Sequence, residues 1–375
     1  MIGFQPYETF QLLIESGGIE RAGTLLTAAC DAFARRPRPT QGELAQFEAL
    51  TQRLFATAAP SACEQAAGML ATSAHLTPLL ERLVVANIGG GIDVFIAEAP
   101  AISPSVQIEL AADGHAPTCA LLARRSDLTR DALARLFAIN SRAVYRALAG
   151  NQALTFSGPW LAAIARAARM DPEVARALLA KPRFDRAQLA PAFFNLAEPG
   201  RLDVLRAFGA RRVPETALKR TYEQLSVATP EFCQALMKLY SANRRPEITR
   251  LFNQITGLDE VRCGEIAHDS GGAALFVILR AFGCKAPDGL KVLVHATIHA
   301  PGRTRSLGDY ARLFELLSAD AMVYLMSIWR GEADLRDFAR PEYQPVAAGP
   351  ARAPAAGQSD LGRAMAVMQR IVGAA

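Results

Sequence analysis

Two histidines in the C-terminal third of the chain have the spacing of a helical metal-binding pair. His295 and His299 (HATIH) lie four residues apart, so on a helix both face the same side. Zinc proteases place a Glu directly after the first such His as general base, but Ala296 holds that position here. Three further side chains could complete a Cys/His zinc site, although their spacing fits no standard template: Cys263, His268 and Cys284. We therefore expect no metal, and histidines that face the core or the solvent.

The tetrapeptide Asp269-Ser270-Gly271-Gly272 matches the sequence around the nucleophile of trypsin-like proteases. That chemistry needs a serine on a β-barrel loop, with His and Asp supplied by other strands, and the sequence contains no convincing strand. The alternative is a helix start, in which Asp269 or Ser270 is the N-cap and the glycines form the turn. The triplet Gly89-Gly90-Gly91 also lacks the spacing of a phosphate-binding loop and predicts a hinge or irregular connection. We expect no catalytic residue, no cofactor and no enzyme activity.

Arginines recur through the middle of the chain. Residues 124–220 hold 18 Lys and Arg against 8 Asp and Glu, a net charge of +10, whereas the rest of the chain sums to −5. Aligned guanidinium groups could bind the phosphates of nucleic acid, a phosphorylated protein or an acidic protein face. The alternative is compositional, because the chain has 36 Arg and only 5 Lys, and exposed charges usually serve solubility.

Seven of these arginines come from successive units of a repeated pattern: Arg142, Arg146, Arg166, Arg169, Arg176, Arg183 and Arg186. Five of them are our candidate binding residues: Arg142, Arg146, Arg169, Arg176 and Arg183. The single tryptophan in this stretch, Trp160, is a possible stacking platform for a base, or else a core residue.

The elements that would position the arginines follow a nearly constant period. Four segments start 26, 26 and 30 residues apart: 93–100 (DVFIAEAP), 119–126 (CALLARRS), 145–152 (YRALAGNQ) and 175–182 (ARALLAKP). Behind each come an apolar residue and a helix-capping residue: Ile102-Ser103, Leu128-Thr129, Leu154-Thr155 and Phe184-Asp185. A period of this length predicts a helical solenoid, in which each unit buries its apolar face only against its neighbours. Arg146 and Arg176 have the same position in their segments, so we expect them on one ribbon of surface.

The chain divides into five regions: N-terminal helices (1–88), short helical repeats of the solenoid (89–228), a C-terminal helical subdomain (229–343), a Pro/Ala/Gly linker (344–360) and a tethered terminal helix (361–375). In the first region we expect helices over 7–16, 19–34, 40–58, 61–73 and 76–87, with a capping box at Thr40 and Glu43. In the repeats we expect helices over 129–138, 141–148, 156–169, 171–180 and 186–196. The C-terminal subdomain should hold helices over 230–242, 247–256, 272–283, 288–299 and 310–330. The terminal helix has one apolar face and could dock on its own chain or on a partner.

Composition supports an all-α fold and a cytoplasmic protein. Of the 375 residues 51% are hydrophobic and 21% charged, and strong helix formers dominate. The N-terminus has neither the positive region nor the apolar stretch of a secretory signal, and no apolar run is long enough to span a bilayer. The six Cys contain no CxxC pair, and we expect free thiols that act as small buried hydrophobes.

The repeat block is followed by two packing motifs: Leu251-Phe252-x-x-Ile255 and Ala273-Ala274-Leu275-x-x-Ile278-Leu279-x-Ala281-Phe282-Gly283. Over residues 76–329 this combination resembles the alphaproteobacterial helical-repeat proteins classed as a domain of unknown function. The resemblance implies a bacterial alpha-solenoid related to HEAT-like and leucine-rich-variant repeats. It implies no assigned activity and no site residues.

Three functions fit this sequence. The first is a non-catalytic scaffold whose helical repeats bind a protein or peptide partner, with no membrane contact. The second is a HEAT-like nucleic-acid binder that uses the basic repeat surface, which extends to a DNA-repair enzyme if aromatic and carboxylate groups converge. The third is a signalling module that reads an acidic or phosphorylated partner, which the sequence does not separate from the first.

Overall fold

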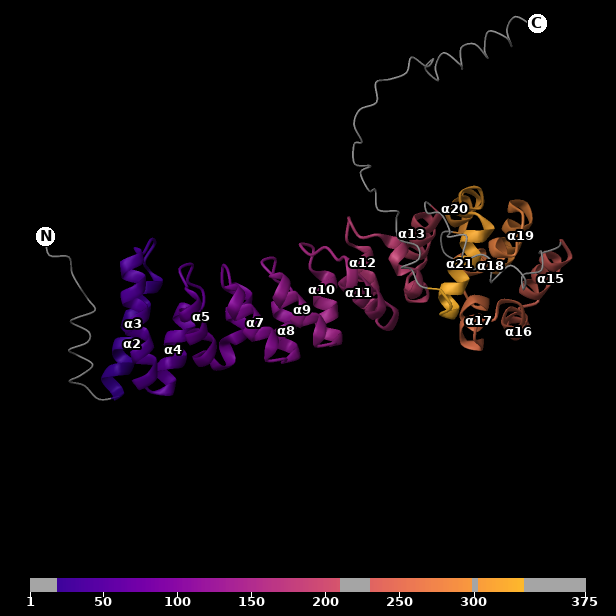
Figure 1. Cartoon of the computed structure of the whole chain (residues 1–375). Helices are drawn as coiled ribbons and strands as arrows, with labels where there is room; N and C mark the ends of the chain where they lie inside the picture. The colour runs from indigo at the N-terminus through magenta and orange to yellow at the C-terminus, as the bar shows by residue number, and fades with distance from the viewer. Residues whose placement is uncertain (1–18, 210–229, 299–302, 334–375) are drawn as a thin grey trace, which may run out of the picture.

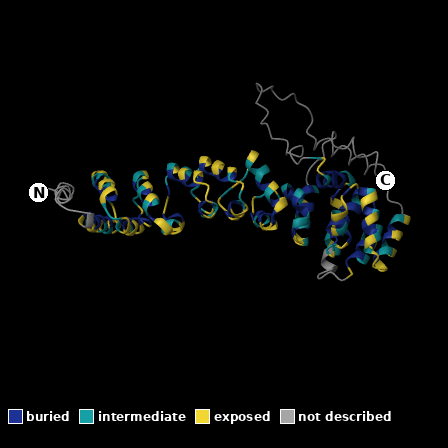
Figure 2. Ribbon diagram, turned by 90° about the horizontal axis from the view of Figure 1, so that it is seen from below, coloured by how far each residue is buried: buried dark blue, intermediate teal, exposed yellow. Residues whose placement is uncertain are grey.

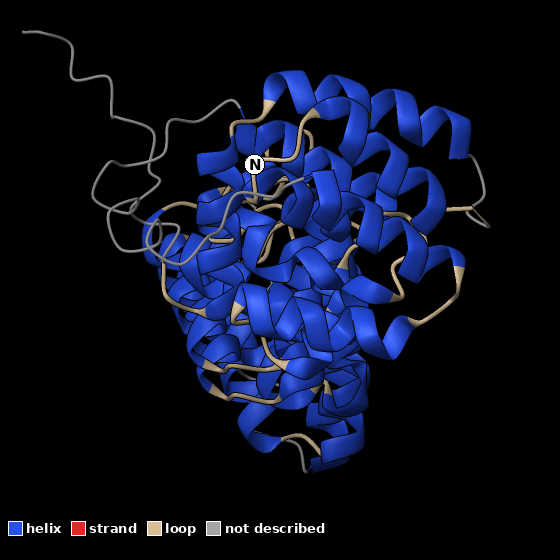
Figure 3. Cartoon of the chain, turned by 90° about the vertical axis from the view of Figure 1, so that its right-hand side faces the viewer, coloured by secondary structure: helices blue, strands red, loops and turns tan. Residues whose placement is uncertain are grey.

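The computed structural model describes residues 19–209, 230–298 and 303–333, and every regular element within these ranges is a helix (Figure 3). The predicted all-α class is therefore confirmed. Within the described residues, no helix combines the length and the apolar character that a bilayer span requires. The predicted helix over 7–16, the linker over 344–360 and the terminal helix over 361–375 lie outside the described residues. So does the predicted boundary between 228 and 229.

The first part of the chain, residues 19–209, forms an extended row of short helices that follow one another in chain order (Figure 1). We call this row the array. Their bounds are α2 Ile19–Ala34, α3 Gln41–Thr57, α4 Pro60–Leu70, α5 Pro78–Asn87, the 3₁₀ turn η1 Gly89–Gly91, α6 Ile92–Glu98, α7 Pro104–Ala112, α8 Ala116–Leu122, α9 Arg130–Ala138, α10 Arg142–Gly150, α11 Gly158–Met170, α12 Pro172–Leu179, the 3₁₀ helix η2 Arg186–Asn195 and α13 Glu198–Gly209.

Helices in this row pack on helices two places along the chain. One layer runs through α6, α8, α10 and α12, and the other runs through α5, α7 and α9. The ribbon is coloured as buried along the inside of the row and as exposed on its outer surfaces (Figure 2). The fourth residue of each repeated segment supplies the centre of this core, because all four are fully buried: Ile96, Leu122, Leu148 and Leu178. Each unit thus buries its apolar face against its sequence neighbours.

The seventh residue of each segment joins one unit to the unit before it. These residues are Ala99, Arg125, Asn151 and Lys181. The Arg125 guanidinium donates to the carbonyl oxygens of Ile96 and Ala99, each at 2.8 Å. The Asn151 amide donates to the carbonyls of Ala123 at 2.9 Å and Arg125 at 2.7 Å. The Lys181 ammonium donates to the carbonyls of Asn151 and Leu154. We call Arg125, Asn151 and Lys181 the donor ladder.

The donor ladder satisfies backbone carbonyls that lie between units and away from solvent. Asn151 is 7% exposed and Lys181 is 5% exposed. Burial lowers the pKa of the Lys181 ammonium, because the apolar surroundings disfavour its charged form. Arg125 also pairs bidentately with Asp127, both contacts being 2.8 Å. Burial alone would raise the pKa of Asp127, but hydrogen bonds from Arg125 and the Ile102 amide lower it. The constant spacing of the units thus aligns hydrogen bonds between units as well as their buried apolar residues.

Local signals in the sequence account for most helix starts. The Thr40–Glu43 capping box is present, and Thr129 accepts a hydrogen bond from the Ala132 amide at the start of α9. Among the starts that differ from expectation, α4 begins at Pro60 rather than after Ser61, and α11 begins at Gly158 with Ser157 as N-cap. Pro159 explains the second case, because proline favours the first turn of a helix. The Gly89–Gly91 triplet forms one 3₁₀ turn that leads directly into α6.

We expect Thr129→Ala to lower the free energy of unfolding by about 1 kcal/mol, because the first turn of α9 loses its side-chain acceptor. Urea unfolding followed by circular dichroism measures the loss. Thr155→Ala is the matched control, since the cap of α11 is Ser157. An equal loss in the two variants would contradict the assignment.

The remaining helices gather at the end of the row (Figure 1). They are α15 Pro230–Ser241, α16 Arg245–Thr256, α17 Glu260–Ala267, α18 Ala273–Ala281, α19 Ala286–Ala296, α20 Arg303–Leu316 and α21 Ala319–Arg330. The predicted helix over 310–330 is wrong as a single element, because Ser318 caps a new helix by accepting from the Ala321 amide at 3.1 Å. Sequence analysis also missed α17.

These C-terminal helices cover the end of the row. Helix α18 is buried on every side, from Ala273 to Leu279, as expected of a helix that is apolar all round. In α21, Trp329 donates from its indole nitrogen to the Ala190 carbonyl at 3.2 Å and packs its ring 5.0 Å from Phe193 and 4.8 Å from Phe194. Helix α13 contacts both α18 and α20. The array and the C-terminal helices therefore share one core.

Candidate functional site

Three adjacent furrows run between successive helices of the array. The first, of about 730 Å³, lies between α8 and α10; the second, of about 330 Å³, lies between α10, α11 and α12. The third, of about 850 Å³, lies between α11, η2 and the end of α21. Arg142 lines the first and second furrows and Arg166 lines the second and third, so these side chains stand on the ridges between them.

Five arginines line the furrows, and we call them the arginine surface: Arg124, Arg142, Arg146, Arg166 and Arg169. They come from three helices or their ends. Arg124 follows α8, Arg142 and Arg146 lie on α10, and Arg166 and Arg169 lie on α11. All five are exposed. The spacing of the units thus brings positive groups from about 45 residues of sequence onto one surface.

The structure brings only part of the predicted arginine set to these furrows. Arg142, Arg146 and Arg169 line them, whereas Arg176 and Arg183 are exposed and line none of the three. Arg176 pairs instead with Glu173 on its own helix at 2.9 Å. Arg146 and Arg176 do have equivalent repeat positions and are both exposed, but they do not share a furrow.

Two members of the arginine surface were not among the candidate residues. Arg166 belongs to the seven repeat arginines, and Arg124 opens the basic stretch, so their types were visible in the sequence. Their role depends on which helix packs opposite each of them, and no local signal gives that.

Asp171 determines which of these arginines keep a free charge. Its carboxylate is buried, accepts from Arg146 at 2.6 and 3.0 Å, and lies 3.8 Å from the Arg142 guanidinium. It also caps α12 by accepting from the Glu173 amide at 3.0 Å. The hydrogen bonds from Arg146 are the main reason that the pKa of Asp171 is lowered. The charge of Arg146 is therefore balanced by that of Asp171, and its side chain is held in place. The charge of Arg142 is balanced only in part, because its guanidinium lies farther from Asp171.

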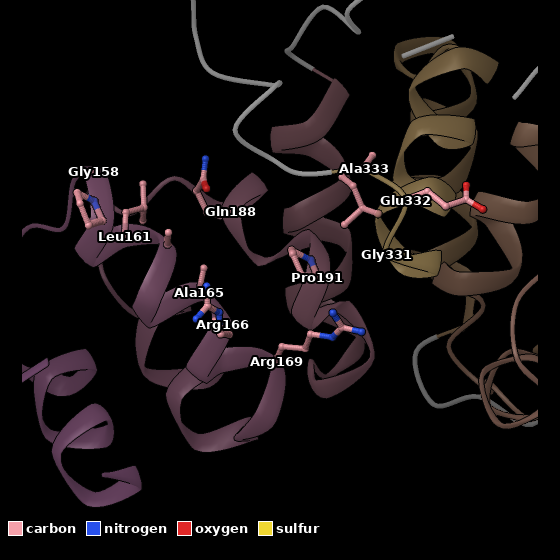
Figure 4. Close-up of a pocket in the computed structure, with 13 residues that line it drawn as sticks. Gly158, Leu161, Ala165, Arg166, Arg169, Gln188, Pro191, Gly331, Glu332 and Ala333 are labelled. Atoms are coloured by element: carbon pink, nitrogen blue, oxygen red, sulfur yellow. The ribbon is translucent and has the colours of Figure 1, made fainter. Parts of the chain in front are cut away.

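The other three arginines of the surface have no ion-pair partner among the described residues. Within the described residues, no carboxylate lies in ion-pair distance of Arg124, Arg166 or Arg169. Figure 4 shows the third furrow, where Arg166 and Arg169 project from α11 while Pro191 and Glu332 lie on the far side. The Glu332 carboxylate is paired with Arg330 at 2.8 Å. Of the three arginines of the surface without an ion pair among the described residues, Arg166 and Arg169 thus lie on α11.

The furrow walls are built from small and apolar residues. Most of the lining residues beside the arginines are Ala, Gly or Pro, which lets a partner chain approach the helices closely. The second furrow adds the Met170 side chain, which is 74% exposed, and the half-buried Tyr145 ring. Arg, Tyr and Met are the residue types enriched at protein interfaces.

Trp160 is not a platform for a nucleic-acid base in this structure. Its ring is half-buried and stacks on Phe137 at 6.2 Å with an interplanar angle of 4°, and the Arg130 guanidinium lies 5.9 Å from the ring centroid. It lines none of the three furrows. Trp160 therefore packs as a core residue, which was the alternative to base stacking.

The other sequence candidates have structural roles. Asp269 accepts from the amides of Gly271 at 3.1 Å and Ala274 at 3.2 Å, so the protease-like tetrapeptide starts α18. His295 contacts the Ser241 hydroxyl at 2.9 Å, and His299 lies outside the described residues. Cys284 lies beside Cys233 rather than beside Cys263 or His268. Within the described ranges, no three His, Cys, Asp or Glu side chains gather as metal ligands would.

Comparison of the chain with protein-family models, with curated proteins and with solved structures found no match.

Proposed function

We propose that the protein is a non-catalytic interaction module that holds an acidic segment of a partner protein on the arginine surface. The observation that carries the proposal is the row of three furrows, in which Arg124, Arg166 and Arg169 have no ion pair with any described residue. A carboxylate-rich segment that crosses the ridges of α10 and α11 meets guanidinium groups at each ridge. It also meets alanine and glycine walls between them. Arg binds carboxylates bidentately, which adds orientation to attraction.

Asp171 supports this proposal because it orients Arg146 and leaves the other arginines of the surface available to a partner. Its ion pair fixes the Arg146 side chain before a partner arrives, so less side-chain entropy is lost on binding. Two of the five guanidinium hydrogens of Arg146 bond Asp171, and the other three can donate to a ligand in the first furrow. Electrostatic attraction by the free arginines speeds encounter with an acidic partner and makes the association salt-dependent.

The proposal extends to the family and the location. We place the chain with the helical-repeat proteins that it resembles, as a HEAT-like bacterial module without enzymatic activity or cofactor. We also propose that it lies in the cytoplasm. The six cysteines, none of which forms a disulfide, support this location because the cytosol keeps thiols reduced. The nucleic-acid alternative has less support, since Tyr145 is the one aromatic ring among the described residues that line the furrows.

The experiment that tests the function is a binding titration with paired charge reversals. Fluorescence anisotropy measures the affinity of the full chain for labelled peptides of alternating Glu and Ala, for the matching Gln peptides and for single-stranded DNA. We expect the Glu peptide to bind and the Gln peptide to bind at least about 10-fold more weakly. Binding should weaken further as salt increases.

The variant Arg166→Glu/Arg169→Glu should weaken binding of the Glu peptide by about 10-fold or more. The control is Arg176→Glu/Arg183→Glu, which makes the same change of net charge at exposed residues outside the furrows. Equal losses in the two variants would show that net charge alone attracts the peptide, and would contradict a site. Preference for DNA over the Glu peptide would favour the nucleic-acid alternative.

A further inference from the structure

A buried carboxyl group lies where the array meets the C-terminal helices. Glu198 is the first residue of α13 and faces Tyr310 of α20. The Tyr310 hydroxyl contacts the Oε1 atom of Glu198 and lies 2.8 Å from the carbonyl oxygen of Gly271, in the loop before α18. The Oε2 atom of Glu198 is buried and has no hydrogen-bond partner among the described residues. Three elements therefore meet at one carboxyl group.

The two contacts of Tyr310 favour a proton on Glu198. A phenol carries one hydrogen, and a peptide carbonyl and a carboxylate are both acceptors only. If Glu198 is ionised, one of the two contacts has no hydrogen between its oxygens. If Glu198 is protonated, its hydroxyl donates to Tyr310 and Tyr310 donates to Gly271. The neutral form is thus the one in which both contacts are hydrogen bonds.

The surrounding charges do not offset a negative charge on Glu198. The nearby Arg201 guanidinium is paired with Asp269 at 3.0 Å, and both side chains are largely buried. Behind Asp269 lie the buried Tyr240 ring and Arg245, whose guanidinium is 4.7 Å from that ring. His268 is exposed, with its Nδ1 atom 2.9 Å from the Gly264 carbonyl. A second carboxylate beside Asp269 would therefore stand without a counter-ion of its own.

We propose that Glu198, Tyr310 and the Gly271 carbonyl form a pH-sensitive latch, closed by a proton on Glu198, that holds the array against the C-terminal helices. Loss of the proton leaves a buried carboxylate with too few donors and weakens the contact of α13 with α20 and with the start of α18. The third furrow has one wall on each side of this contact, on α11 and at the end of α21.

The pKa of Glu198 agrees with this geometry. Burial, assisted by the negative charge of Asp269, raises it from 4.5 to about 7 and outweighs the Tyr310 hydroxyl, the Arg201 charge and the Ala273 amide, which act to lower it. A folded-state pKa above the unfolded value means that the proton stabilises the fold fully below pH 4.5. That contribution is lost as pH rises through about 7.

The first test compares Glu198→Gln with the wild type in urea unfolding of the full chain from pH 5 to pH 9. Glutamine keeps the shape and donates a hydrogen to Tyr310 at every pH. The two proteins should have similar unfolding equilibria at pH 5. At pH 8.5 the wild type should be less stable than the variant, by on the order of 100-fold in the unfolding constant. The exposed Glu315 on α20 supplies the control, and Glu315→Gln should follow the wild type across the range.

The second test reads the proton directly, without relying on the stability of a variant. Carbon-13 labelling of Glu side-chain carboxyls, with the Glu198 signal assigned by its loss in Glu198→Gln, gives the titration of that group in the folded protein. A midpoint between about pH 6 and 8 is expected. A midpoint at the ordinary value of Glu would overturn the proposal. So would a Glu198→Gln variant that is less stable than the wild type at pH 8.5.

Discussion

The change Asn151→Asp should lower the free energy of unfolding by about 3 kcal/mol or more, because it reverses the bonding of one rung in the donor ladder. The wild-type amide donates to the carbonyls of Ala123 and Arg125 at 2.9 and 2.7 Å. Aspartate has nearly the same shape but puts an oxygen in place of the Nδ2 atom, which supplies both hydrogens. Two inter-unit carbonyls then lose their donor and face a negative charge.

The effect of Asn151→Asp should depend on pH in a defined direction. Burial against carbonyl oxygens raises the pKa of the new carboxyl group above its unfolded value. The variant therefore recovers stability as pH falls through the folded-state pKa, and is least stable at neutral and alkaline pH. Chemical denaturation at pH 5 and pH 8 measures the difference.

Gln152→Glu is the matched control for this variant. It makes the same amide-to-acid change at the next residue, where the side chain is exposed. We expect a change within about 0.5 kcal/mol there. If Asn151→Asp were as mild as its neighbour, the donor ladder would have no part in holding the units together.

The change Trp329→Ala should lower the free energy of unfolding by about 3–5 kcal/mol, because it empties the packed contact between α21 and η2. Trp329 is 8% exposed and joins the Phe193 and Phe194 rings. Its loss removes the tilted and edge-on ring contacts, the hydrogen bond to Ala190 and the filling of the space between two parts of the molecule. We expect the C-terminal helices to unfold at lower urea than the array, in a separate transition.

Comparison of Trp329→Ala with Trp329→Phe separates the contributions of ring packing and hydrogen bonding, and Trp160→Phe supplies a background for fluorescence. Trp329→Phe keeps a ring but loses the indole hydrogen bond, so it should cost about 1 kcal/mol. Trp160→Phe leaves Trp329 as the only tryptophan of the chain, so its fluorescence then reports this contact alone. Equal losses in Trp329→Ala and Trp329→Phe would mean that ring packing contributes little.

Much of the helical row could be predicted from the sequence because its determinants are local. The period located the units, and the fourth position of each segment is apolar and buried, as in Leu122 and Leu148. The Thr40 capping box and the Thr129 cap act within a single helical turn. The start of α11 was misplaced although its signal was present, since Ser157 precedes a glycine and a proline.

Contacts between distant residues were beyond the sequence. Trp329 and Ala190 are separated by 139 residues, and Tyr310 and Glu198 by 112, so no periodic pattern links them. The break before α21 was missed because apolar residues continue across it, and only the Ser318 cap marks it.

The candidate site shows the same limit. The excess of arginine was visible, but the distinction between Arg169 in a furrow and Arg176 outside it depends on how η2 and α21 pack. The neutralising role of Asp171 depends on a contact that spans 25 residues. In both cases the role of the residue depends on which helices pack together, and the sequence does not show that.

The hydrogen bonds of the donor ladder all point the same way along the chain. Each donor belongs to a later unit, and each acceptor is a carbonyl of the unit before it. A ribosome releases the N-terminal end first, and domains generally form in that order. A newly released unit therefore finds its acceptors already in place, while carbonyls that still await a partner can be hydrated. The ladder has the polarity that a chain needs to assemble during its own synthesis.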